Sequence, residues 1–131
     1  MVLGLLQFEL LVPGAESLKD KRRVVQSVKD RLHREHLVSV AEVGALESHT
    51  RAMLALALVG ADGRHVGEVF DGIAVKLRAL HDAELGDTRR DIFTSGAIDA
   101  MREEAESPGG DALRAEMLAR AGEADHTRGT P

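Results

Sequence analysis

The chain contains no cysteine, no tryptophan and no tyrosine, and phenylalanine occurs only 3 times in 131 residues. Without cysteine there is no disulfide, no thiolate nucleophile and no cysteine-ligated metal centre. So few aromatic rings also argue against binding single-stranded nucleic acid by base stacking, which needs exposed rings. Hydrophobic residues make up 44% of the chain, so the core must be built from aliphatic side chains and alanine.

Long apolar runs are missing as well. No segment reaches the roughly 18 consecutive apolar residues of a membrane span, and the apolar start, Met1 to Leu11, lacks the basic residues that open a signal peptide. We therefore expect a cytoplasmic protein with no membrane partner. Motifs for phosphate loops, dinucleotide binding and hydrolase nucleophiles are absent too, and no cofactor is predicted.

The formal net charge of -5 is spread unevenly along the chain. Residues 97–131 hold 4 Lys and Arg against 8 Asp and Glu, so most of the negative charge lies there. We expect one domain over residues 1–96, followed by an acidic C-terminal tail over residues 97–131. Helical composition over Ile98 to Ala105 and Ala112 to Ala121 predicts marginal helices in this tail.

Apolar periodicity and turn signals predict four strands and two helices, in the order strand–helix–strand–strand–helix–strand. This is the α+β, ferredoxin-like split βαβ plan, a four-stranded antiparallel sheet with both helices on one face. The expected strands are Val2 to Leu11, Leu37 to Val43, Arg51 to Val59 and Arg89 to Thr94, and the expected helices run from Ser17 to about His36 and from about Arg64 to Asp82.

The third expected strand, Arg51 to Val59, is apolar on both of its faces. A strand with one solvated face should alternate with polar residues. Since both helices are expected on the same side of the sheet, its other side is bare in a monomer. A homodimer formed through this open sheet face is the simplest way to cover it.

The first expected helix opens with a basic run, Ser17-Leu18-Lys19-Asp20-Lys21-Arg22-Arg23. Ser17 and Asp20 have the spacing of a capping box. Cations at a helix start oppose the helix dipole, which favours a functional reason for them. The alternative is a solvated helix surface with i,i+4 ion pairs. We interpret these residues as a basic patch for phosphate, RNA or an acidic protein: Lys19, Lys21, Arg22, Arg23 and Lys29.

Glu42 lies in an otherwise apolar strand. It is a candidate partner for Arg51 on the neighbouring strand, or for a Lys or Arg of the first helix, and the pair is either structural or part of a site. His33 and His36 have i,i+3 spacing, which falls short of the i,i+4 pair of a zinc helix. Near the helix C-terminus they complement the dipole instead, and no metal site is predicted.

These motifs together resemble the YlxP-like family of small bacterial proteins, also described as domain of unknown function 503. The resemblance implies a ferredoxin-like, dimeric fold, and genes that often lie beside those for translation initiation factor two and a ribosome-binding factor. It implies no established activity and no catalytic residues. Where the family usually carries an aromatic residue before the third strand, this chain has His49. The resemblance covers about residues 1–95 and rests on Gly4-Leu5-Leu6, Glu9-Leu10, Pro13-Gly14-Ala15, Ser17 to Arg23, Val38 to Val43 and Arg51-Ala52.

We therefore expect a non-enzymatic accessory protein that associates with the ribosome or RNA through its basic first helix. The first alternative is a homodimeric protein-interaction module that binds an acidic protein segment. The second is an enzyme acting on a small phosphorylated or acidic substrate through Glu42 with Arg51 or the basic helix, although no nucleophile–base pair is visible in the sequence.

Overall fold

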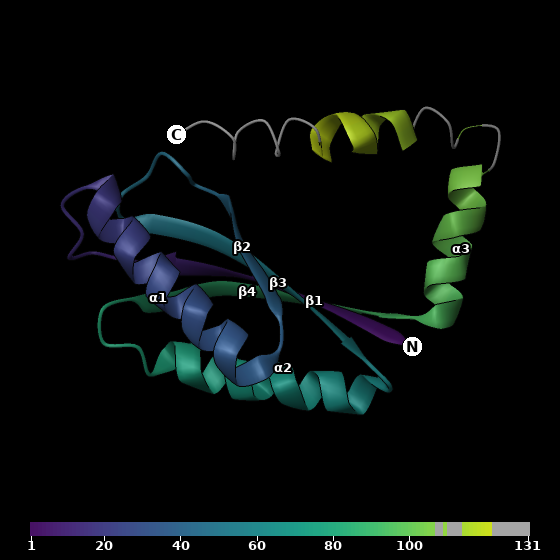
Figure 1. Cartoon of the computed structure of the whole chain (residues 1–131), viewed down its shortest axis with the longest axis horizontal. Helices are drawn as coiled ribbons and strands as arrows, with labels where there is room; N and C mark the ends of the chain where they lie inside the picture. The colour runs from purple at the N-terminus through teal and green to yellow at the C-terminus, as the bar shows by residue number, and fades with distance from the viewer. Residues whose placement is uncertain (107–108, 110–113, 122–131) are drawn as a thin grey trace. The chain divides into compact units, whose positions relative to one another are not determined.

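The computed structural model describes residues 1–106, 109 and 114–121 (Figure 1). The chain divides into two compact units, Met1–Thr94 and Ser95–Pro131. The second unit contains the helix α3(Ser95–Glu106) and a further helical segment over residues 114–121, and the predicted helical residues 112 and 113 lie outside the described residues. No helix in the described part of the chain is long and apolar enough to span a membrane.

The first unit is built from six elements, which form one antiparallel sheet and two helices. The strand order in the sheet is β2-β3-β1-β4, and all neighbouring strands are antiparallel. The predicted α+β class and the predicted succession of six elements are therefore confirmed, and α3 follows them. The elements are β1(Val2–Leu11), α1(Leu18–His36), β2(Ser39–Gly44), β3(Arg51–Gly60), α2(Gly63–Arg78) and β4(Glu84–Thr94).

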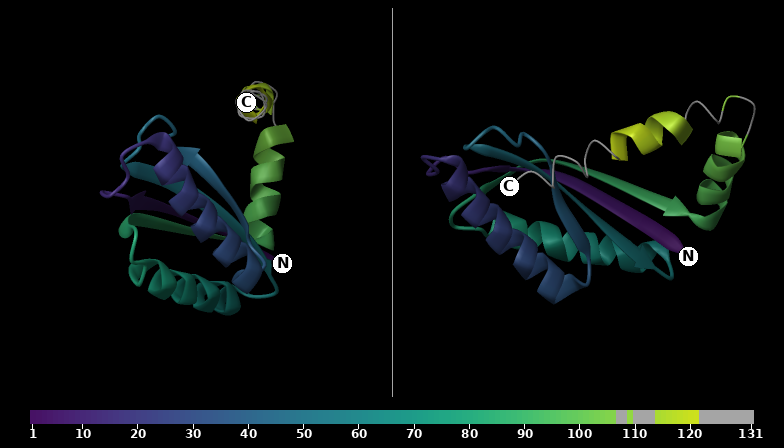
Figure 2. Two further views of the ribbon diagram at one scale, coloured as in Figure 1. Left: turned by 60° about the vertical axis from the view of Figure 1, so that its left-hand side comes forward. Right: turned by 45° about the horizontal axis from the view of Figure 1, so that its top comes forward.

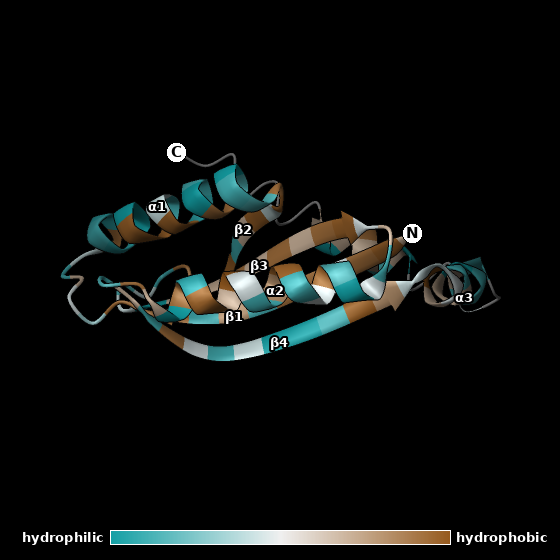
Figure 3. Cartoon of the chain, turned by 90° about the horizontal axis from the view of Figure 1, so that it is seen from below, coloured by the Kyte–Doolittle hydropathy of each residue, from teal (hydrophilic) through white to brown (hydrophobic). Residues whose placement is uncertain are grey.

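Both helices of the first unit cover the same side of the sheet (Figure 2). The helix α1 contacts β2 and β3, while α2 contacts β1, β3 and β4. Figure 3 shows that α1 turns its hydrophobic side to the sheet and its hydrophilic side outward. Burial of the apolar side chains between these layers is the main favourable contribution to folding. The largest buried apolar side chains of this core are Leu6, Phe8, Leu10, Leu32, Leu54, Leu56, Phe70, Ile73 and Leu77.

Gly4 lets α2 lie close to β1. A Cβ atom at this position would lie 2.5 Å from Cγ1 of Val66 and 2.7 Å from Cζ of Phe70. Carbon atoms do not approach so closely, so any larger residue would push α2 away from the sheet. A glycine inside an apolar strand is therefore explained by packing.

The bounds of several elements differ from those predicted. The second strand begins at Ser39 rather than Leu37, because Leu37 caps α1 in the left-handed conformation with φ of 50°. The second helix ends at Arg78 rather than Asp82, and the N–H of Ala79 bonds to the carbonyl oxygens of Lys76 and Leu77. The segment that follows α2 is thus a loop.

The fourth strand is five residues longer than predicted, since it begins at Glu84. Gly86 looked like a strand breaker in the sequence, but it lies at a register irregularity between β1 and β4. Its missing side chain leaves room for Glu9, whose carboxylate oxygen would lie 2.6 Å from a Cβ at this position. Further along β4, Arg90 pairs with Asp71 of α2 at 2.7 Å, so the strand docks on α2 through a polar contact as well as through apolar ones.

Neither α1 nor α2 covers the second side of the sheet. The central residues of β3 on this side, Met53, Ala55 and Ala57, are half-buried, whereas Val59 is 66% exposed and Leu5 of β1 is 38% exposed. This side therefore presents a mostly apolar surface at the middle of the sheet, with exposed Gln7 of β1 opposite Ala55. That a second molecule covers it stays a prediction.

The C-terminal ends of α1 and α2 are joined by a polar cluster. The Lys76 ammonium lies 2.7 Å from Nε2 of His36 and 2.5 Å from a carboxylate oxygen of Glu35. The hydrogen bond from Lys76 holds the pKa of Glu35 below its ordinary value of 4.5. Partial burial, reinforced by the Lys76 charge, lowers the pKa of His36 from 6.5. His36 is therefore neutral at neutral pH and accepts a hydrogen bond, instead of complementing the helix dipole as a cation.

This cluster predicts a pH dependence of stability. Because folding lowers the pKa of His36, the unfolded chain binds more protons than the folded chain below about pH 6.5. The contribution of His36 to the free energy of unfolding is therefore fully present above this pH. It is lost as the pH decreases toward the folded-state pKa. In thermal unfolding between pH 7 and pH 5, we expect His36→Gln to lose less stability than the wild type, because glutamine accepts the Lys76 hydrogen bond without titrating.

The matched control is His65→Gln, which alters an exposed histidine at the other end of α2. It should follow the wild-type curve. Equal slopes for the wild type and His36→Gln would contradict the role given to His36.

Candidate functional site

The helix α1 starts with the capping interactions that its sequence suggests. The Ser17 hydroxyl accepts a hydrogen bond from the Asp20 N–H at 3.2 Å. The Asp20 carboxylate in turn accepts one from the N–H of Glu16 at 3.1 Å, one residue earlier than a standard capping box. These two residues therefore fix where the basic run begins as a helix.

Lys21, predicted as part of the basic surface patch, is fully buried instead. Its Nζ atom lies 3.0 Å from the carbonyl oxygen of Ala45, 3.3 Å from that of Arg51 and 3.0 Å from Oε2 of Glu42. Three oxygens thus surround the ammonium, which donates hydrogen bonds to the two carbonyls. The prediction that Lys21 binds an external partner is wrong, because its side chain points into the protein between α1, the end of β2 and the start of β3.

Glu42 and Arg51 do not form the pair that was considered for them. Glu42 pairs with Lys21 of the first helix, and its side chain is only 15% exposed. The guanidinium of Arg51 lies 2.6 Å from Glu9 of β1. This geometry therefore does not support an enzymatic site built on Glu42 beside Arg51. The alternative partner considered for Glu42, a cation of the first helix, is the one observed.

The contact between Lys21 and Glu42 is ionic rather than a well-directed hydrogen bond. Oε2 of Glu42 is buried and lies within 3.0 Å of the ammonium, yet it accepts no hydrogen bond of good geometry. The two carbonyl oxygens that Lys21 contacts flank the loop between β2 and β3. Ala45 there adopts a positive φ of 56°, which turns the chain out of β2. The buried ammonium thus holds this loop against the first turn of α1.

The other predicted cations do remain on the surface. Lys19, Arg22 and Arg23 are exposed and Lys29 is half-buried. Within the described part of the chain, none of these four side chains forms an ion pair, and the same holds for exposed Arg34. Arg31 pairs with Glu35 at 3.4 Å. The outer surface of α1 therefore carries six cations against the carboxylates of Asp20, Asp30 and Glu35.

The cations lie on both flanks of α1, with a shallow hollow on each flank. One hollow of about 540 Å³ holds three arginines and one carboxylate. The Asp30 carboxylate accepts a hydrogen bond from Gln26 at 2.8 Å, so it faces its own helix. Guanidinium groups converging on a shallow surface are suited to phosphate or carboxylate groups. The residues that line this hollow are Arg23, Gln26, Ser27, Asp30, Arg31 and Arg34.

Among the described residues, no group of three or more His, Asp or Glu side chains could hold a metal ion. On the opposite flank of α1, His33 lines the second hollow together with Gln26, Lys29, Asp30 and Val40. Apart from the Asp30 carboxylate, the ionisable side chains that line the two hollows on α1 carry positive charge or can donate hydrogen bonds. Chemically, such a surface binds anions.

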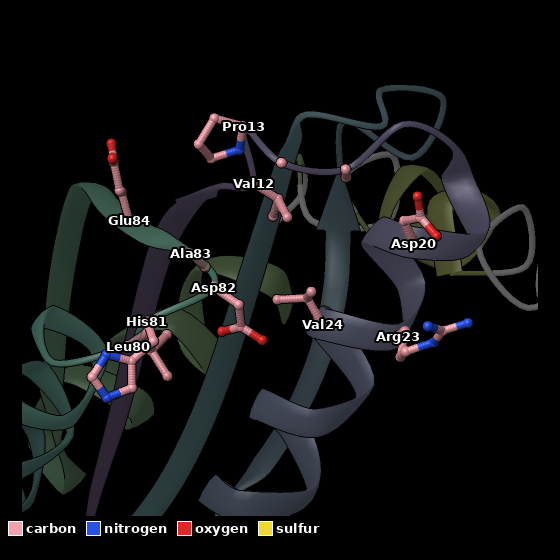
Figure 4. Close-up of a pocket in the computed structure, with 12 residues that line it drawn as sticks. Val12, Pro13, Asp20, Arg23, Val24, Leu80, His81, Asp82, Ala83 and Glu84 are labelled. Carbon is pink, nitrogen blue, oxygen red and sulfur yellow. The ribbon is translucent and has the colours of Figure 1, made fainter.

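A cavity was not anticipated from the sequence (Figure 4). It lies beside the start of α1, between the loop after β1 and the loop before β4. His81, Asp82 and Glu84 line it, although the sequence pattern assigned Asp82 to the end of a helix and grouped none of the three with α1. A run of ionisable residues interrupted by one alanine was the available signal, and only the fold shows what it faces.

Comparison with known proteins identifies one family. The family model described as "Protein of unknown function (DUF503)" matches residues 3–90. The YlxP-like name is consistent with this family, so the resemblance seen in the sequence is confirmed. No curated protein matches the chain.

Lys21 is expected to contribute to stability and not to binding. Lys21→Met preserves most of the side-chain length but leaves Glu42 and two carbonyl oxygens without the ammonium. Removing one partner of a buried ion pair costs about 3–5 kcal/mol, so we expect a loss of this size in the free energy of unfolding, measured by urea denaturation. In the double variant Lys21→Met with Glu42→Leu, part of the loss should be recovered.

Lys29→Met is the matched control on the same helix, and it should change stability by no more than about 0.5 kcal/mol. If Lys21→Met and Lys29→Met had equal effects, or if Glu42→Leu brought no recovery, the ion pair would not have the role assigned to it.

Proposed function

The chain belongs to the DUF503 family, and for this member we propose a non-enzymatic function as an RNA-binding accessory protein that contacts RNA through the outer surface of α1. The observation that carries the proposal is the set of surface cations on this helix without an ion-pair partner among the described residues: Lys19, Arg22, Arg23, Lys29 and Arg34. They stand out because residues 1–96 are almost neutral as a whole.

The dimensions of α1 support a nucleic-acid backbone as the partner. From Lys19 to Arg34 the helix rises about 22 Å at 1.5 Å per residue. Positive charge distributed over such a length, on both flanks of a helix, suits a row of phosphates better than one small anion. Arginines supply three of these cations, and their planar guanidinium groups bind phosphate oxygens in pairs. The neighbourhood of translation genes that the family resemblance implies agrees with RNA.

The aromatic side chains favour structured RNA over single strands. Phe8 and Phe70 are fully buried and Phe93 is half-buried, and these are all the aromatic residues of the chain. Stacking of bases on Phe, Tyr or Trp rings, which is typical of single-strand binding, is therefore not available on α1. Duplex RNA is recognised through its shape and backbone, for which cations suffice.

Charge reversal on α1 should weaken RNA binding. For the double variant Arg23→Glu with Arg34→Glu, we expect about a tenfold or greater loss of affinity for an RNA duplex of about 20 base pairs at low salt. The dependence of the affinity on salt should also become shallower, since fewer counterions are released. Fluorescence anisotropy at several salt concentrations measures both quantities.

The matched control is Arg64→Glu with Arg78→Glu, which makes the same change in charge at two exposed positions of α2. It should keep nearly the wild-type affinity and slope. Equal losses in both variants would indicate a general charge effect, and a wild-type protein without salt-sensitive RNA binding would overturn the proposal.

The apolar second side of the sheet favours a second role, in self-association. We propose that a second copy of the chain covers this side, which neither α1 nor α2 does. Its centre is formed mainly by small and apolar residues, Leu5, Ala55 and Ala57, with Gln7 of β1 opposite Ala55. Charged pairs lie toward its margins, namely Glu9 with Arg51 and Arg89 with Asp91. An apolar centre with a polar margin is the usual composition of a protein interface.

Ala57→Glu should dissociate such a dimer, because it places a carboxylate at the centre of the interface without a partner. We expect a shift from dimer to monomer in analytical ultracentrifugation at micromolar concentration, with an increase of about tenfold or more in the dissociation constant of the dimer. Val75→Glu, at an exposed position of α2, should remain dimeric. A wild-type protein that is monomeric, or an Ala57→Glu variant that stays dimeric, would rule out this interface.

A further inference from the structure

The cavity beside the start of α1 has an apolar floor that is separate from the main core. Its volume is about 510 Å³, within the range of small-ligand sites in proteins. Val12 and Ala83 are buried in this floor, and Val24 and Leu80 are partly buried against them. An aliphatic chain placed on this floor would be removed from water on one side, which favours its binding.

The ionisable groups around the cavity are predominantly acidic. Three carboxylates, those of Asp20, Asp82 and Glu84, line it together with the guanidinium of Arg23 and the ring of His81. Figure 4 shows that Asp82 and Val24 lie beside each other at the cavity, whereas the guanidinium of Arg23 and the carboxylate of Glu84 point away from it. Asp82 forms no ion pair within the described part of the chain. Asp82 is thus an exposed carboxylate at the edge of the apolar floor.

Several backbone N–H groups around the start of α1 are already bonded within the protein. Helix N-termini bind anions through free N–H groups. Here the N–H of Ala15 bonds to the carbonyl oxygen of Val12, and that of Glu16 to the Asp20 carboxylate. The N–H groups of Asp20 and Lys21 bond to Ser17. With these donors occupied and the Asp82 carboxylate beside the floor, a phosphate or carboxylate ligand is disfavoured.

From the apolar floor and the placement of Asp82 beside it, we propose that this cavity binds an aliphatic primary amine. The hydrocarbon chain lies on Val12, Val24, Leu80 and Ala83, and the ammonium group faces Asp82. The two sources of such a group are a free alkylamine or diamine and the lysine side chain of another protein. This proposal is independent of RNA binding by α1, because it uses other side chains and the opposite charge.

The test is titration of the ¹⁵N-labelled full chain with pentan-1-amine and, separately, with pentanoate, followed by NMR. We expect the amine to bind with shifts centred on Val12, Val24 and Ala83, and pentanoate to bind much more weakly. Asp82→Asn should weaken amine binding about tenfold, the cost of losing one charge-assisted contact. Asp87→Asn, an exposed position on β4, is the matched control and should bind as the wild type does.

Two further titrations distinguish the sources, and either preference is consistent with the proposal. Tighter binding of 1,5-diaminopentane indicates a free diamine, and tighter binding of a lysine-containing peptide indicates a protein partner. Absence of amine binding at millimolar concentration, equal binding of pentanoate, shifts elsewhere in the protein, or unchanged affinity in Asp82→Asn would each overturn the proposal. The comparison of amine with pentanoate is made on the wild-type chain, so it stands even if a variant fails to fold.

Discussion

The first unit of this protein depends on one buried positive charge. The Lys21 ammonium has no access to solvent, and a charge in that position is tolerated only because oxygens surround it. Those oxygens come from the Glu42 side chain and from the backbone at Ala45 and Arg51. The start of α1 must therefore lie against the end of β2 and the start of β3, which are distant from it in sequence, for the ammonium to be surrounded by oxygens. An arrangement of this kind favours one specific packing of α1 over others that apolar contacts alone would permit.

This interaction also explains why two motifs of the sequence occur together. From the sequence, the basic run at Ser17 to Arg23 was interpreted as a binding patch, and Glu42 was a candidate partner either for Arg51 or for a cation of the first helix. In the structure they are the two halves of one contact. Lys21 is structural, as are the helix-capping residues Ser17 and Asp20, while Lys19, Arg22 and Arg23 remain exposed. The basic run thus combines a buried anchor with a charged surface, and the anchor orients the surface.

The burial of Lys21 could have been predicted from helical spacing. Together with Val25, Val28 and Leu32 it forms a stripe at intervals of four, three and four residues, which is the buried side of a helix. A lysine in such a stripe requires a carboxylate from another element, and from the sequence Glu42 was already a candidate partner for a cation of the first helix. The order and type of the six elements also followed from periodicity. What the sequence could not provide was the longer β4, because a glycine at a bulge has the same sequence pattern as a glycine at a turn. The cavity could not be predicted from the sequence for a related reason, since its walls include two loops that only the sheet brings together.

The topology places the two proposed binding surfaces on opposite sides of the sheet. Both helices lie on one side, and the apolar surface of β1 and β3 lies on the other. A dimer formed through the apolar side would leave α1 of each copy facing outward, so self-association and RNA binding do not compete for the same residues. Two copies of α1 on one particle would also bind a long RNA with the advantage of a second, linked contact, provided that the RNA reaches both helices. Dimer formation would then increase the affinity for long RNA more than for short RNA, even though no residue of the dimer interface touches the RNA.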